Sequence, residues 1–125
     1  MSEIADLVVT DRPSRGRTLA TDRARAALVA QVVALATGLS ARAIAGGKRE
    51  TQAAAQARQM AMYLAHIAFT WPLARVAHAF GCDRTTAGYA CHRVEERRDD
   101  PRFDARLSAL ETCLRAAPRE PEPLT

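Results

Sequence analysis

The sequence predicts an all-α protein of about six helices that contains a helix-turn-helix. Two observations predict this class: 27 of the 125 residues are alanine, and only 5% are aromatic. Alanine has the highest intrinsic helix propensity, whereas strands favour β-branched and aromatic side chains. The remaining apolar side chains suffice for one compact core, so we expect a single domain.

Residues 1–20 are predicted to form a flexible arm, because they contain Pro13 and Gly16 and have no sustained hydrophobic period. The domain is expected to span 22–117. The tail 118–125 is rich in proline and charge, and is therefore predicted to be disordered.

The first helix is expected to begin near Asp22, a favourable N-cap, and to end at Gly38. Its apolar stripe would be Leu28, Val32 and Leu35, which follow the i, i+4, i+7 period of a buried helix face. Ser40 should cap a short second helix that ends at the pair Gly46 and Gly47.

Four further helices are predicted, over residues 52–69, 72–80, 84–98 and 101–117. Pro72 suits a first helical position, Gly81 suits a helix end, and Asp83 and Asp100 suit N-caps. The buried positions expected in these helices are Met60, Leu64 and Ile67, then Leu73, Val76 and Phe80, then Ala87, Ala90, Cys91 and Val94, and finally Phe103, Leu107, Leu110 and Leu114.

Composition excludes several functional classes. No apolar run is long enough to span a membrane, and the N-terminus does not resemble a signal peptide. Three cysteines without a secretory signal indicate free thiols in a reducing compartment. No motif for catalysis, a metal or a nucleotide is present, so we expect no enzyme activity and no cofactor. The formal net charge is +4, and 17 of the 18 basic residues are arginine, which suits phosphate and guanine recognition.

Residues 72–97 have the layout of a helix-turn-helix, in which the second helix enters the major groove of DNA. An ordinary solvated helix after a glycine turn is the alternative. In the DNA-binding interpretation, Gly88 would allow close approach of the backbone. The side chains expected to face DNA are Asp83, Arg84, Thr85, Thr86, Tyr89, His92 and Arg93.

The segment ARQMAMYLAHIAFTWPLARVAHAFGCDRTTAGYACHRVEE, residues 57–96, resembles the C-terminal DNA-binding domain of the bacterial replication initiator DnaA. The matching motifs are ARQMAMYLA, the AFG turn, and DRTT leading into AxxAC. The resemblance extends more weakly over 24–115. It implies an all-helical domain that binds duplex sites called DnaA boxes, with the sequence DRTT at the base-reading position.

The sequence departs from the family at several positions. The family usually has histidine where Arg84 stands and arginine where Cys82 stands. The turn is one residue shorter than in many members. The family's minor-groove arginine aligns near Glu50, so Lys48 or Arg49 would take its place on phosphate or in the minor groove. These departures put the usual box sequence in doubt. The ATPase module of the initiators is absent from these 125 residues, so we interpret the chain as a stand-alone relative of their DNA-binding domain.

Two other patterns allow a second interpretation. His78, Cys82, Cys91 and His92 lie close in sequence, but their spacing does not match paired zinc ligands. The mixed-charge run 95–100 suits a solvated helix end, and a partner-binding surface is its alternative interpretation.

The sequence therefore predicts a sequence-specific double-stranded DNA-binding protein, expected to be cytoplasmic and nucleoid-associated. The resemblance implies that it regulates replication initiation, or transcription at related sites. The rival prediction is a protein-interaction module that modulates the replication initiator or the regulators of its nucleotide state.

Overall fold

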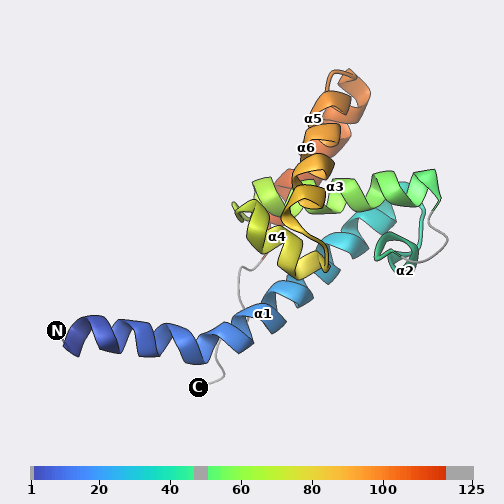
Figure 1. The fold of residues 1–125 in the computed structure, drawn as a ribbon. Coiled ribbons are helices and arrows are strands. Elements are labelled where there is room, and N and C mark those ends of the chain that lie inside the picture. Colours follow the sequence, from blue (N-terminus) through green and yellow to red (C-terminus); the bar gives the residue numbers. More distant parts are fainter. Residues whose placement is uncertain (1, 47–50, 118–125) are drawn as a thin grey trace.

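The computed structural model describes residues 2–46 and 51–117, and it is built from helices alone over these ranges (Figure 1). This confirms the predicted all-α class. The helices are α1 (Ser2–Thr37), α2 (Ala41–Ile44), α3 (Gln52–Ala68), α4 (Leu73–Phe80), α5 (Arg84–Arg97) and α6 (Pro101–Ala116). The tail predicted to be disordered, 118–125, lies outside the described residues.

The predicted start of the first helix is wrong. Helix α1 begins at Ser2, and Asp22 lies inside it rather than at its N-cap. The carboxylate of Asp22 is instead buried, and it accepts two hydrogen bonds of 2.8 Å from the Arg75 guanidinium of α4. Residues 1–20 carry no hydrophobic period, so the sequence offered no helical signal there.

Of the three residues in the predicted buried stripe of α1, Val32 is partly buried against the core and the other two are exposed. Leu35 is 88% exposed and Leu28 is 39% exposed, while Val29 and Val33 are completely buried. The predicted residues and the buried ones both follow helical spacing. Because this segment is apolar on more than one face, the spacing alone did not identify the buried face. The buried face of α1 is formed by Val29 and Val33 together with the small residues Ala26 and Ala30. These short side chains let α3 and α4 pack close to α1.

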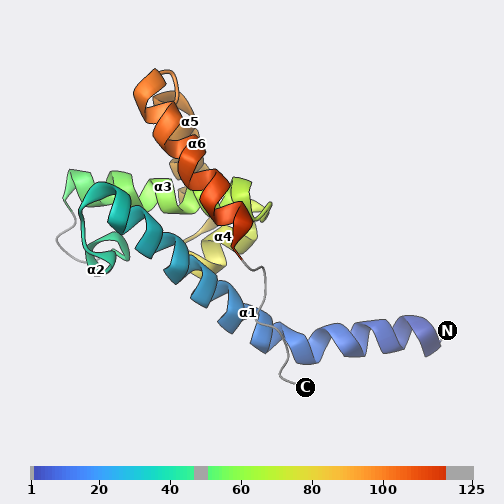
Figure 2. The ribbon, with the colours of Figure 1, turned by 180° about the vertical axis from the view of Figure 1, so that it is seen from behind.

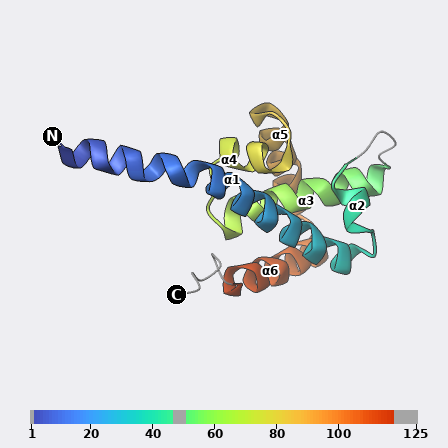
Figure 3. The same ribbon diagram turned by 90° about the horizontal axis from the view of Figure 1, so that it is seen from below.

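Helix α3 is the centre of the domain and contacts each of the other five helices. Helix α1 crosses α3 obliquely, with α4 on one side and α6 on the other (Figures 2 and 3). Tyr63 and Trp71 are buried in the core. The predicted core positions of α3 to α6 are buried or partly buried: Met60, Leu64, Ile67, Leu73, Val76, Phe80, Ala87, Ala90, Cys91, Val94, Phe103, Leu107, Leu110 and Leu114.

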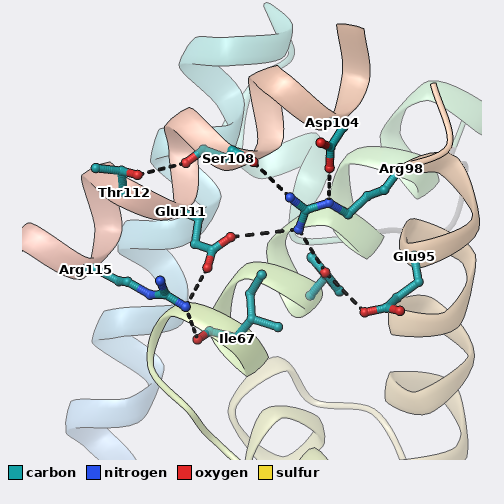
Figure 4. A network of polar contacts seen from close by, with 9 residues as sticks. Ile67, Glu95, Arg98, Asp104, Ser108, Glu111, Thr112 and Arg115 are labelled. Carbon is teal, nitrogen blue, oxygen red and sulfur yellow. Dashed lines mark hydrogen bonds and ion pairs between the residues drawn. The ribbon is translucent and has the colours of Figure 1, made fainter. Parts of the chain in front are cut away.

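Arg98, just after α5, joins α5 to α6 and α3 (Figure 4). Its guanidinium donates to Asp104, to Ser108 Oγ at 2.9 Å and to the Tyr63 hydroxyl at 3.0 Å. Tyr63 in turn donates to Glu95 at 3.2 Å, and burial raises the pKa of Tyr63. Because this network joins three helices, it sets the direction in which the α5–α6 pair leaves the domain.

Candidate nucleic-acid interface

Helices α4 and α5 form the helix-turn-helix. Gly81 follows α4 with φ +74°, a left-handed conformation that glycine adopts without strain. The Cys82 N–H donates to the Ala77 carbonyl at 2.9 Å, and the Gly81 N–H donates to the His78 carbonyl at 3.3 Å. This pair of bonds is a Schellman motif, which ends a helix sharply. The predicted end of α4 at Gly81 is thus confirmed. Pro72, however, is the N-cap and not the first helical residue.

Asp83 is the N-cap of α5, as predicted. Its carboxylate accepts a 2.8 Å hydrogen bond from the Thr86 N–H. The hydrogen bonds from Thr86, chiefly from its backbone, lower the pKa of Asp83. Asp83 is thus engaged in starting the helix. The first helical turn that follows it is free to meet a ligand.

The first turn of α5 is an open polar surface. Arg84, Thr85 and Thr86 are all exposed, and Tyr89, one turn further, is 59% exposed. On the opposite side, the residues predicted to face inward are buried: Ala87, Ala90, Cys91 and Val94. The fold therefore gathers the predicted base-reading residues on one accessible side of one helix.

His92 and Arg93 are also exposed, but both lie beside a carboxylate. His92 Nε2 is 3.3 Å and Arg93 Nη1 is 3.1 Å from the side chain of Glu96. Exposed ion pairs are weak, typically less than about 1 kcal/mol, so Arg93 can exchange Glu96 for another anion. The sequence analysis did not consider this pairing, although its i, i+3 and i, i+4 spacing on one helix can be read from the sequence.

Arg58 of α3 is a residue that the sequence analysis missed. Its guanidinium donates to the carbonyls of Ala45, after α2, and of Phe80, at the end of α4, the latter at 2.8 Å. Gly46 has φ +98°, and a Cβ there would lie 3.2 Å from Arg58 Nη1. Arg58 therefore joins the residue before the basic loop to the turn before α5. No local sequence signal marks such a contact, because its partners are 13 and 22 residues away.

The basic loop itself, with Lys48, Arg49 and Glu50, lies outside the described residues. Its two ends are described: Gly46 packs on Arg58, and Thr51 caps α3 by accepting from the Ala54 N–H at 3.0 Å. Both ends are thereby fixed to α3.

Gly88 lies against α4. A Cβ at Gly88 would meet Leu73 Cδ1 of α4 at 3.6 Å, which is an ordinary packing distance. The side without a Cβ therefore faces α4, and not the surface that carries Arg84 and Tyr89.

The cysteines and histidines of this region are separated. Cys91 is buried, and burial raises the pKa of its thiol to about 11. Cys82 lies 3.8 Å from the Met62 sulfur, while His78 is exposed. Over residues 19–46 and 51–117, whose side chains the structure describes, three or more His, Cys, Asp or Glu side chains nowhere gather as metal ligands would. Over the same residues, no helix combines the length and apolar character needed to cross a membrane.

The fold and the open polar turn define the class: an all-α domain with a helix-turn-helix. Residues 26–94, more than half of the chain, match the family "Bacterial dnaA protein helix-turn-helix", and the chain belongs to this family. Membership of this family indicates DNA binding related to replication initiation.

Two solved structures share the fold. A crystal structure of a DNA replication initiation factor superposes with a TM-score of 0.72 and 24% identity over 91% of this chain. A replication initiator DnaA bound to AMPPCP and single-stranded DNA superposes with a TM-score of 0.67 and 26% identity over 80% of this chain. The chain spans only 35% and 30% of those two proteins. No curated protein shows significant similarity to it.

Proposed function

We propose that this chain is a sequence-specific double-stranded DNA-binding protein that acts at DnaA-box-like sites in the regulation of replication initiation or of transcription. The observation that carries the proposal is the exposed first turn of α5, where Asp83, Arg84, Thr85 and Thr86 stand in the family's helix-turn-helix. Such a protein would work at the nucleoid, without enzymatic activity of its own.

In this proposal the N-terminal end of α5 enters the major groove. Arg84 can donate two hydrogen bonds to guanine O6 and N7, and a threonine methyl can contact the thymine methyl. The positive dipole at the start of α5 favours a backbone phosphate. Tyr89, His92 and Arg93 follow along the exposed side of α5. Lys48 and Arg49 would contact phosphate or the minor groove.

A second function is supported by the pairing of Glu96 with His92 and Arg93, which offsets positive charge on the proposed DNA side of α5. In that alternative, the domain keeps the family fold but binds the replication initiator or a regulator of its nucleotide state.

A fluorescence-anisotropy titration separates the two functions. The full chain is titrated against a duplex carrying a DnaA box, a scrambled duplex and a single strand of the box sequence, each at two salt concentrations. The proposal expects at least a tenfold preference for the box duplex, which is about 1.4 kcal/mol. Weak, equal and strongly salt-sensitive binding to all three would contradict it, because generic electrostatics alone produce that behaviour. Pull-downs with the initiator would then test the alternative.

A further inference from the structure

Two acidic residues follow directly after the exposed, DNA-facing side of α5. From Arg84 to Arg93, the helix has no acidic residue, and Glu95 and Glu96 come next. Glu95 is turned toward α3, where it accepts a hydrogen bond of 3.2 Å from the Tyr63 hydroxyl. Glu96, in contrast, pairs with residues of the proposed DNA side. Of the two carboxylates, Glu96 is therefore the one that bears on DNA contacts.

The carboxylate of Glu96 lies beside two basic side chains at once. Its Oε1 is 3.1 Å from Arg93 Nη1, and its Oε2 is 3.3 Å from His92 Nε2. The three residues are three and four positions apart, a spacing at which side chains meet on the surface of a helix. Both oxygens of one carboxylate are thus engaged by the side chains that stand last on the DNA-facing side.

The position of Arg93 along α5 suits a contact with the DNA backbone. Arg93 is nine residues after Arg84, which is about 13 Å along the axis at a rise of about 1.5 Å per residue. The major groove of DNA is about 12 Å wide. When the first turn of α5 meets the base edges, Arg93 therefore comes to the border of the groove, where the backbone phosphates lie. Glu96 follows within one further turn, so its charge stands close to the same phosphates.

A phosphate and Glu96 compete for the same guanidinium. The side chains of Arg93 and Glu96 are about half exposed, and exposed ion pairs are weak, so a phosphate can displace the carboxylate. The displaced carboxylate stays beside the phosphate, and two negative charges at short range repel each other. Glu96 is thus unfavourable for DNA binding both before the exchange, because it occupies the cation, and after it, because it repels the phosphate.

We propose that Glu96 is an intramolecular competitor of DNA, which occupies Arg93 and His92 and thereby lowers the affinity of the domain for a duplex. This role rests on the proposed DNA binding by α5. Contacts with phosphates fix the position of a protein on DNA but carry no sequence information. Glu96 therefore limits the strength of binding, and it leaves the sequence preference to the first turn of α5.

The test compares the full chain with Glu96→Gln, which keeps the size and helix propensity of the side chain and removes its charge. Anisotropy titrations use the box duplex and the scrambled duplex over a range of salt concentrations. Affinity for both duplexes should rise by the same factor, about three- to tenfold. The slope of log affinity against log salt should become steeper by about 0.9, the value for one further neutralised phosphate.

Two controls separate this role from a general effect of charge. Asp99→Asn removes the same charge from an exposed position beyond α5, and should change the affinity by less than about twofold because solvent and salt screen it. In a chain that already carries His92→Gln and Arg93→Gln, adding Glu96→Gln should also change the affinity by less than about twofold, since the cations that it releases are gone. Thermal unfolding by circular dichroism verifies that each variant folds.

Three outcomes would overturn the proposal. The first is an affinity and a salt slope that are unchanged in Glu96→Gln. The second is a gain that persists undiminished in the chain without His92 and Arg93. The third is a gain confined to the box duplex, because Glu96 would then act on base reading. Equal binding of both duplexes by the unmodified chain would instead contradict the proposed sequence-specific function, and the gain in Glu96→Gln would still be measured on each duplex.

Discussion

Arg58 Nη2 lies 2.8 Å from the carbonyl oxygen of Phe80, and the same guanidinium donates to Ala45. One side chain of α3 thus donates hydrogen bonds both to a carbonyl at the end of α4 and to a carbonyl just after α2. The two regions proposed to contact DNA, the start of α5 and the loop after Gly46, are held in one arrangement by this residue.

Replacing Arg58 by methionine should destabilise the domain by about 1.5–3 kcal/mol, since it removes hydrogen bonds from a charged donor and leaves the carbonyls without them. Affinity for the box duplex should fall as well. Chemical denaturation and anisotropy measure the two effects. Arg58→Lys keeps the charge but cannot reach both carbonyls with a planar fork, so it should lose nearly as much stability. Full recovery of stability by lysine would show that charge alone matters.

Arg84→Ala should cost about 1–3 kcal/mol of binding to the box duplex and should relax its sequence preference. The reason is that Arg84 is exposed in the first turn of α5, the position that we propose reads guanine. Titrations against box duplexes with single substitutions measure this. Arg23→Ala, an exposed arginine of α1, serves as the control. If Arg84→Ala binds every sequence as tightly as the unmodified chain, Arg84 is not a reader.

Replacing Lys48 and Arg49 together by alanine should lower DNA affinity equally for all sequences. The slope of log affinity against log salt should also become shallower, by about 0.9 for every phosphate that is no longer neutralised. Titrations over a range of salt concentrations give this slope. Glu50→Gln removes a negative charge from the same loop, and should raise the affinity instead. An unchanged slope in the double variant would remove Lys48 and Arg49 from the interface.

Gly88→Ala should stabilise the domain by up to about 1 kcal/mol, because alanine has the higher helix propensity and the new Cβ meets Leu73 at an ordinary distance. DNA affinity should stay unchanged, since that Cβ faces α4. Thermal unfolding and anisotropy give the two numbers. A loss of affinity at unchanged or higher stability would mean that DNA approaches the backbone at Gly88 after all.

Arg97→Met and Arg98→Met form a matched pair of adjacent substitutions. Arg97→Met removes a buried donor without a partner, so the free energy of unfolding should stay the same or rise. Arg98→Met removes the donor of the hydrogen bonds to Tyr63, Asp104 and Ser108, and should cost about 1.5–3 kcal/mol. Urea unfolding compares the two directly. Equal destabilisation by both would show that Arg97 also has a stabilising partner.

The predictable parts of this fold are those with local causes. Ser40, Asp83 and Asp100 cap helices where the sequence indicated, because a cap depends on residues two or three positions away. Gly81 ends α4 for a similar reason. The exposed first turn of α5 followed from the same reasoning, together with the family motif.

The parts that could not be predicted depend on distant partners. The buried face of α1 is chosen by what α3 and α4 present to it, and a segment rich in alanine, valine and leucine offers several equivalent faces. The two structural arginines, Arg58 and Arg98, look like ordinary polar residues until the helices that supply their acceptors are assembled. The arginine content predicted a basic interface, but it could not separate the arginines that support the fold from those left exposed.

The pairing of Asp22 with Arg75 has a practical meaning for anyone who shortens this protein. The family match starts at residue 26, and a fragment cut there would look complete. It would nevertheless lack the carboxylate that Arg75 binds from 53 residues away, and with it the bond that anchors α4 to α1. A fragment that begins at or before Asp22 keeps this contact between α1 and α4, and one that begins at residue 26 loses it, so the two should differ in stability.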